Sequence, residues 1–412
     1  MPLRHSPGGV AWSLVLVSTL ICLSTLPRSC GAAPAAEAGT VRVATTEQLQ
    51  RAVAQAQPGT RILLAPGTYR GGLSFAKVRG RAGAPIVLAA ADEQRRPVVE
   101  GGPSGLHFSS PAYLELRHLV ISGAHGNGLN IDDGGVSDQP AHHVTLEGLE
   151  VRDIGPRGNR DGIKLSGLDH FAVIDCRVEQ WGDSGSGIDM VGCHEGRVVG
   201  CFFRQRGDSP GNGVQTKGGS ARIQIQRCRF EHAGGRAVNL GGSTGDDYFR
   251  PPAADCEARD ITVEDCTFLG SQAAIAFVGA DRAVVRYNTI YRPERWVVRI
   301  LQESRGARFV PCRHGSFQHN LIVFHAAEIR AIVNSGDGTD PQSFQFADNW
   351  WFCADDPPRS SRLSLPVRET GATYGRDPQF VDAAQGDLRC RPNSPARNAG
   401  VRPAAHQPDS AP

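Results

Sequence analysis

Lysine is the rarest charged residue type in this chain of 412 residues. Lysine and arginine together number 44, yet only Lys77, Lys164 and Lys217 are lysine. Lys217 stands in GNGVQTKGGS (211–220), where the flanking glycines let a bound molecule come close to the backbone. Lysine acts as a general base once it is unprotonated, which proteins achieve by lowering its pKa from about 10.4. Lys217 is therefore our candidate catalytic base.

Other polar residues recur at matching places in similar short segments. NRDGIKLSG (159–167) carries Asp161 and Lys164, GDSGSGIDM (182–190) carries Asp189, and GGRAVNLGG (234–242) carries Arg236. If these segments are strands stacked in register, their side chains on one face form a single polar column. The predicted column contains Asn130, Lys164, Asp189, Gln215 and Asn239, with Lys217 in the neighbouring column.

The elements that must position these residues are short alternating strands. Segments such as GIKL, GIDM and GVQT alternate apolar and polar residues, which is typical of a strand with one buried face. The alternation predicts the following inward-facing residues: Ile163, Leu165, Ile188, Met190, Val214, Val238 and Leu240. The polar column then faces outward.

A second pattern recurs between these strands and ends in Cys or Asn. Cys176, Cys201, Cys228 and Cys266 are followed by Asn288, Asn320 and Asn349 at equivalent places. We interpret them as an inward stack at one corner of a coil, where Asn side chains bond to one another and Cys fills the same space. Cys193, Cys256, Cys312, Cys353 and Cys390 lie outside the column, and their pairing stays open.

A strand, turn and strand unit that repeats about every 25 residues cannot bury its own apolar face, so the units must stack. The arrangement resembles the right-handed parallel β-helix of polysaccharide lyases and predicts an all-β solenoid over 41–400. The segment 41–71 is similar to the entry of that fold, with an amphipathic helix in TTEQLQRAVAQA that covers the first coil. Thr45 and Gln48 are placed for a capping box.

GVQTKGGS resembles the catalytic-lysine strand of polysaccharide lyase family 6, which includes chondroitinase B and alginate lyases. That resemblance implies β-elimination with Lys217 as the base. The family carries an Arg one coil later in the same column, where this chain has Gly241. Arg236, five residues earlier, is the nearest candidate for that role.

The same segments also resemble family 9 pectate lyases, which bind Ca²⁺ through an Asp cluster. Asp161 and Asp189 match two of its Asp positions and imply a calcium site, but Gly185 and Ser186 replace the adjacent Asp pair. In this alignment Gln215 takes the place of the catalytic lysine.

Two insertions, 132–143 and 243–258, follow strands of the polar face and are expected to wall a groove over 160–240. The second carries Arg250, which we predict contacts substrate together with Lys164, Asp189, Gln215 and Asn239. A flat polar surface suits an extended sugar chain with many hydroxyl groups.

The sequence therefore predicts a lyase that cleaves a uronate-containing polysaccharide. Two alternatives stay open. A glycoside hydrolase on the same fold needs paired carboxylates, for which Asp132 and Asp133 are the adjacent candidates. A non-catalytic β-helix that binds glycans or serves as a surface protein needs no such groups.

The termini and the net charge limit where the protein is found and which partners it has. Arg4 and His5 precede an apolar run (11–26) and small residues (30–39), which is the order of a secretory signal peptide. We expect cleavage within 32–36, a protein that is secreted or periplasmic, and a disordered tail over 401–412. A net charge of +2 gives no reason to expect nucleic acid. We also expect no membrane span and a monomer.

Overall fold

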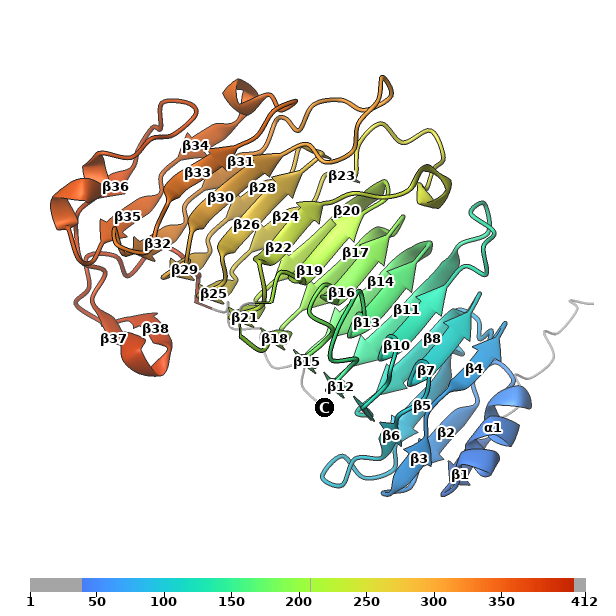
Figure 1. The fold of residues 1–412 in the computed structure, drawn as a ribbon. Helices are drawn as coiled ribbons and strands as arrows, with labels where there is room; N and C mark the ends of the chain where they lie inside the picture. The colour runs from blue at the N-terminus through green and yellow to red at the C-terminus, as the bar shows by residue number, and fades with distance from the viewer. Residues whose placement is uncertain (1–38, 208, 404–412) are drawn as a thin grey trace, which may run out of the picture. The chain divides into compact units, whose positions relative to one another are not determined.

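The computed structural model describes residues 39–207 and 209–403, and within them three long parallel sheets run side by side (Figure 1). The predicted signal peptide, 1–36, and residues 404–412 of the predicted tail lie outside the described residues. From Leu73 to Cys353 the chain passes through the three sheets in the same order in every coil, and two coils give two short strands each to one sheet. The predicted parallel β-helix is confirmed.

The sheet that carries the predicted site has ten strands and is called the site sheet below. Its strands are β4 (Leu73–Ala76), β7 (Leu106–Ser109), β10 (Leu129–Asp132), β13 (Ile163–Ser166), β16 (Ser186–Val191), β19 (Asn212–Lys217), β22 (Arg236–Gly241), β26 (Ala273–Val278), β30 (Trp296–Leu301) and β33 (Ala331–Ser335).

The next sheet along each coil has fourteen strands. They are β1 (Thr40–Val43), β2 (Arg61–Leu64), β5 (Ile86–Ala90), β8 (Ala112–Arg117), β11 (Ala141–Glu147), β14 (Leu168–Ile174), β17 (His194–Val199), β20 (Ser220–Gln226), β23 (Ala258–Arg259), β24 (Thr262–Glu264), β27 (Ala280–Asp281), β28 (Val284–Arg286), β31 (Ser316–Gln318) and β34 (Gln345–Ala347).

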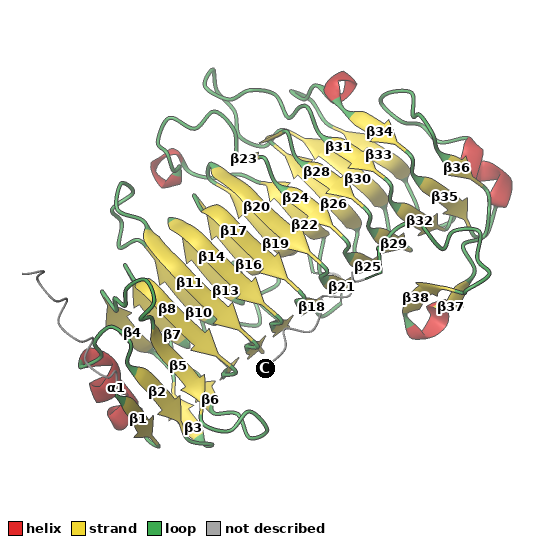
Figure 2. Cartoon of the chain, turned by 180° about the vertical axis from the view of Figure 1, so that it is seen from behind, coloured by secondary structure: helices red, strands yellow, loops and turns green. Residues whose placement is uncertain are grey.

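The third sheet has twelve strands, and Figure 2 shows the three sheets from behind. Its strands are β3 (Thr68–Arg70), β6 (Val98–Glu100), β9 (Val120–Ser122), β12 (Glu150–Arg152), β15 (Arg177–Glu179), β18 (Phe202–Arg204), β21 (Arg229–Glu231), β25 (Thr267–Leu269), β29 (Thr289–Tyr291), β32 (Leu321–Phe324), β35 (Trp350–Cys353) and β36 (Thr373–Tyr374). Outside the three sheets, β37 (Phe380–Asp382) and β38 (Asp387–Cys390) pair antiparallel.

The described residues contain one α-helix, α1 (Thr46–Ala54), which packs against β1, β2 and β4. Thr45 Oγ1 accepts a hydrogen bond from the Gln48 backbone N–H at 3.2 Å, as the sequence predicts. The Gln48 side chain reaches back to the N–H of Ala44, at 2.7 Å, one residue earlier than a standard capping box. Leu49 and Val53 are buried beneath the helix. Short 3₁₀ helices span Asp246–Tyr248, Pro341–Ser343, Pro357–Ser361 and Ala383–Gln385.

The predicted Cys/Asn column is a buried corner of the coil, and each member precedes a strand of the twelve-stranded sheet. Asn320 donates from Nδ2 to the Asn349 Oδ1 at 3.0 Å, and its own Oδ1 accepts from Asn288 Nδ2 at 3.0 Å. All nine cysteines among the described residues are free, and Cys176, Cys201, Cys228 and Cys266 are buried. The residue before each member turns the corner, often with a left-handed backbone, as at Asp265 with φ 55°.

We expect Asn320→Ala to destabilise the fold more than Cys228→Ala does. The first change leaves the backbone N–H of Asn288 and the carbonyl of Val285 without their buried partner, a loss of roughly 2–4 kcal/mol. The second removes one sulfur atom that only donates weakly, at roughly 1–2 kcal/mol. Chemical denaturation of both variants measures the difference, and equal losses would contradict the hydrogen-bonded ladder.

Candidate functional site

The strand register brings the predicted polar column together on the outer face of the site sheet. Lys164 pairs with Asp189, Asp189 with Gln215, and Gln215 with Asn239 in successive strands. Lys217 ends β19 and pairs with Val191 of β16. We call this row of side chains, together with Asp161, Lys217 and Arg236, the polar strip. The inward residues predicted for these strands are fully buried.

Two of the three lysines in the chain meet at one carboxylate oxygen. Asp189 Oδ2 contacts Lys164 Nζ directly and lies 3.4 Å from Lys217 Nζ. Asp161 Oδ2 lies 3.7 Å from the same Lys164 Nζ, so Lys164 sits between two carboxylates. The other oxygen of Asp189, Oδ1, is buried and has no hydrogen-bond partner. The geometry is a compact cluster of two lysines and two aspartates.

Lys164 is an ammonium group at neutral pH. Burial lowers the pKa of Lys164, but the charges of Asp189 and Asp161 outweigh burial and hold the pKa above its ordinary value. A fixed positive charge is therefore built into the floor of the strip.

Solvent reaches the basic side chains of the strip and hardly reaches Asp161 and Asp189. The side chains of Lys164, Lys217 and Arg236 are 20%, 16% and 19% exposed. Those of Asp161 and Asp189 are 3% and 1% exposed. Glu303, the partner of Arg236, is 35% exposed, so the outward positive charge without an exposed carboxylate partner lies at Lys164 and Lys217. This charge favours an anionic ligand.

Asp161 is the member of the cluster whose ionised form is least favourable. Burial and the nearby charge of Asp189 raise the pKa of Asp161 to about 6, although Lys164 and the Ser186 N–H, at 2.8 Å from Asp161 Oδ1, act in the opposite direction. Ionised Asp161 is therefore costly to the folded state.

We expect this cost to be visible in the pH dependence of stability. The folded pKa of about 6 lies above the ordinary value of 3.8, so between these values the folded protein holds a proton that the unfolded chain has lost. Stability is then lost as the pH rises from about 4 to about 6. Asp161→Asn removes this loss. The free energy of unfolding of the variant minus that of the wild type is therefore expected to be roughly 1–3 kcal/mol larger at pH 7 than at pH 4.5. Urea denaturation at both pH values measures it, and a constant difference would refute it.

Arg236 begins β22, at the far end of the strand from Lys217, but its side chain extends along the strip. Its Nη1 donates to Asn239 Oδ1 at 3.3 Å and its Nη2 to Glu303 Oε1 at 2.6 Å. Arg299 of β30 continues the row, and burial together with the charge of Arg236 lowers its pKa. The structure thus places Arg236 on the same face as Lys217, at the other end of the polar strip.

Gln215 and Asn239 use their amides within the protein. Both donate to the carbonyl of Gly241, at 3.3 Å and 3.2 Å, and Gln215 Oε1 accepts from Asn212 Nδ2 at 3.0 Å. Both side chains are buried. These contacts stabilise the turn after β22 and occupy the groups that would otherwise reach a sugar.

Arg250 is the one predicted substrate contact that the structure does not bring to the strip. Its guanidinium forms two hydrogen bonds with Asp169, at 2.8 Å and 2.6 Å, and further bonds with the carbonyls of Gly192 and Ser137. Burial raises the pKa of Asp169, but bonds from His194 and Arg250 outweigh it and hold the pKa well below its usual range. Arg250 instead anchors the 243–258 insertion to the fourteen-stranded sheet and to the 132–143 insertion.

Glu257 is a buried residue that sequence reasoning missed. Its Oε2 accepts from the Gly218 N–H at 2.8 Å and from Thr244 Oγ1 at 2.7 Å, and its Oε1 accepts from the Thr244 N–H at 2.9 Å and from Ser304 Oγ. It fixes the backbone directly after Lys217. Glu257 lies at the end of an insertion, outside every repeat, so no periodic signal points to it.

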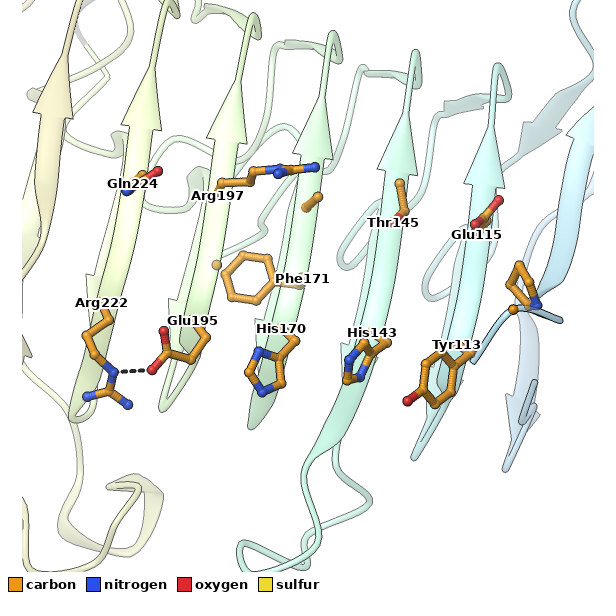
Figure 3. A pocket seen from close by; sticks show the side chains of 14 residues that line it. Tyr113, Glu115, His143, Thr145, His170, Phe171, Glu195, Arg197, Arg222 and Gln224 are labelled. Atoms are coloured by element: carbon orange, nitrogen blue, oxygen red, sulfur yellow. Dashed lines mark hydrogen bonds and ion pairs between the residues drawn. The ribbon is translucent and has the colours of Figure 1, made fainter. Parts of the chain in front are cut away.

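A separate groove of about 670 Å³ lies on the outer face of the fourteen-stranded sheet (Figure 3). Tyr113, His143 and His170 line it from successive strands, with ring centroids 4.4 Å and 5.0 Å apart. Because the three rings pack on one another, a structural role for this ladder accounts for the three residues. The groove contains none of the residues of the polar strip.

Two further searches of the described residues bear on partners. In 39–207 and 209–403, no helix combines the length and apolar character needed to cross a membrane. In the same ranges, no group of three or more His, Cys, Asp or Glu is placed to hold a metal ion.

Comparisons with known proteins agree with this fold. The family model described as "Right handed beta helix region" matches residues 104–313. No curated protein matches the sequence significantly.

Solved structures resemble the chain at low identity. The pectate lyase Pel9A has a TM-score of 0.57 at 16% identity and covers 89% of this chain and 93% of its own. A GH136 lacto-N-biosidase from Eubacterium ramulus has a TM-score of 0.52 at 13% identity and covers 80% of this chain and 64% of its own. An alginate lyase from Paenibacillus sp. str. FPU-7 has a TM-score of 0.49 at 19% identity and covers 73% of this chain and 96% of its own. At such identities the likeness concerns the fold, and the matched half of the chain shows that this protein belongs to the right-handed β-helix family.

Proposed function

We propose that the protein cleaves an anionic, uronate-containing polysaccharide by β-elimination, with Lys217 as the base. One observation carries the proposal: Lys164 and Lys217 are exposed on the polar strip while Asp161 and Asp189 are buried beneath them, and Arg236 is exposed on the same face beside Glu303. A chain of uronates offers one carboxylate per sugar to the positive charges of Lys164 and Arg236, while Lys217 acts as the base in its neutral form. Because the sequence predicts a signal peptide, we expect this activity outside the cell or in the periplasm.

In the proposed reaction, Lys217 Nζ takes the proton from C5 of a uronate. The electron pair forms a C4–C5 double bond, the bond from C4 to the leaving sugar oxygen breaks, and that oxygen takes a proton from solvent. Removal of the C5 proton requires that the neighbouring carboxylate be neutralised, and Arg236 is the cation assigned to that task. Lys164, the closer partner of Asp189, offsets the carboxylate charge that Lys217 also faces.

A hydrolase is less well supported by the same residues. Hydrolysis of a glycosidic bond uses two accessible carboxylates on either side of the bond. Asp161 and Asp189 are buried and paired with Lys164. Asp132 accepts hydrogen bonds from Ser109 and Asn130 and also binds His107.

The direct assay uses purified mature protein with alginate, pectate and chondroitin, and with a neutral glucan as control. Elimination creates an unsaturated sugar, so we expect a rise in ultraviolet absorbance with at least one uronate polymer and none with the glucan. New reducing ends without absorbance would replace the proposal with hydrolysis. Binding without any product would replace it with a non-catalytic glycan-binding role.

We expect Arg236→Ala to weaken the use of an anionic polymer. Loss of the guanidinium leaves Glu303, which is 35% exposed, unpaired on the strip and removes the cation assigned to the substrate carboxylate. A fall in kcat/KM of about 10–1,000-fold is the expected size for one charged contact of this kind. Arg197→Ala, on the fourteen-stranded sheet, changes the net charge equally and serves as the control. Equal effects of the two variants would contradict a specific role for Arg236.

A further inference from the structure

The place between Asp161 and Asp189 is already filled by a cation. The resemblance to family 9 pectate lyases implies that these two carboxylates help hold Ca²⁺. In the structure Lys164 Nζ contacts Asp189 Oδ2 and lies 3.7 Å from Asp161 Oδ2, so the ammonium group stands between the two carboxylates. The two carboxylates therefore have their counter-charge from the chain itself.

The positions that would complete a calcium site cannot supply oxygen ligands here. A Cβ added to Gly185 would lie 2.1 Å from the carbonyl oxygen of Arg160, so this backbone has no room for a side chain at that position. The Ser186 hydroxyl donates to Gln215 Oε1 at 3.2 Å, and its N–H donates to Asp161 Oδ1. Calcium takes six to eight oxygen ligands, and the strip offers two carboxylates that already share an ammonium group. With Lys164 in place, the residues present do not fit calcium.

We propose that Lys164 acts as a tethered cation that replaces a divalent metal in the polar strip. It neutralises Asp161 and Asp189 from within the fold, and its exposed fraction faces the same side as Lys217 and Arg236. The site therefore carries a fixed positive charge whatever the calcium concentration outside the cell. The consequence for catalysis rests on the proposed function, whereas the absence of calcium binding does not.

The test is calcium titration calorimetry on the full mature protein and two variants. We expect the wild type to bind no calcium at this site, because the ammonium group repels a second cation. Lys164→Ala frees the two carboxylates, and with water molecules as the remaining ligands it is expected to bind calcium at least tenfold more tightly than the wild type. The added change Asp189→Asn is expected to abolish that gain. Circular dichroism establishes that each variant is folded, and Lys164→Gln replaces Lys164→Ala if the latter does not fold.

Two results would overturn the inference. One is calcium binding by the wild type that Asp189→Asn removes, which would show that Lys164 leaves room for the metal. The other is a folded Lys164→Ala or Lys164→Gln that binds calcium no more tightly than the wild type. A separate arm adds a chelator to the ultraviolet assay, where unchanged activity is expected. If no polymer is cleaved at all, the proposed function fails while the calorimetry still decides the role of Lys164.

Discussion

Replacing Lys217 with alanine is expected to lower the rate of elimination by about 10²–10⁴-fold, the usual contribution of a positioned general base. Lys217 is half-buried at the end of β19, and its Nζ is held 3.4 Å from Asp189. Alanine removes the amine and leaves the backbone, which Glu257 fixes through Gly218. The measurement is the initial rise in ultraviolet absorbance on the best uronate polymer.

The third lysine provides a matched control for this variant. Lys77 is exposed on the turn after β4 and has a left-handed backbone with φ 57°, so Lys77→Gly is the change that its conformation tolerates. We expect Lys77→Gly to retain the wild-type rate. A folded Lys217→Ala that keeps more than a third of the activity would assign the base to another residue.

Asp189→Ala is expected to give the largest loss of stability among the strip variants. Asp189 is buried, and the change leaves Lys164 without its closest counter-charge and Lys217 without its anchor. Removing one partner of a buried ion pair costs about 3–5 kcal/mol, because the remaining charge stays in a poorly solvated place. Chemical denaturation at neutral pH gives the change in the free energy of unfolding.

A double-mutant cycle with Lys164→Met separates the lost pair from lost packing. Methionine keeps the length of the side chain and removes its charge, so the double variant Lys164→Met/Asp189→Ala has no stranded ammonium at position 164. We expect it to be more stable than Asp189→Ala alone by about 1–3 kcal/mol. Simple additivity of the two single changes would show that Lys164 and Asp189 are not energetically coupled.

Periodicity explains why so much of the fold could be predicted. In-register stacking of parallel strands turns equal positions in each repeat into neighbours, so Lys164, Asp189, Gln215 and Asn239 could be aligned from spacing alone. The Cys/Asn corner followed from the same logic, and the shared column correctly made Lys164 and Asp189 neighbours.

The residues that sequence reasoning misplaced lie where the repeat is interrupted. Arg250 belongs to an insertion, and its partner Asp169 is 81 residues away, so no repeat position relates the two. Glu257 and Glu303 likewise act through contacts made by loops. The sequence also did not reveal that two outward-facing side chains are buried. Gln215 and Asn239 occupy outward positions of their strands, yet both side chains bend to the carbonyl of Gly241.

The most direct test of the central claim is mass spectrometry of the products formed in water enriched in heavy oxygen. A polymer that the wild type cleaves is digested to completion, and the new chain ends are analysed. Elimination predicts fragments that carry a C4–C5 double bond and no heavy oxygen at the cleavage site, and their absence from the Lys217→Ala digest. Saturated fragments that have gained heavy oxygen would show hydrolysis and contradict the account.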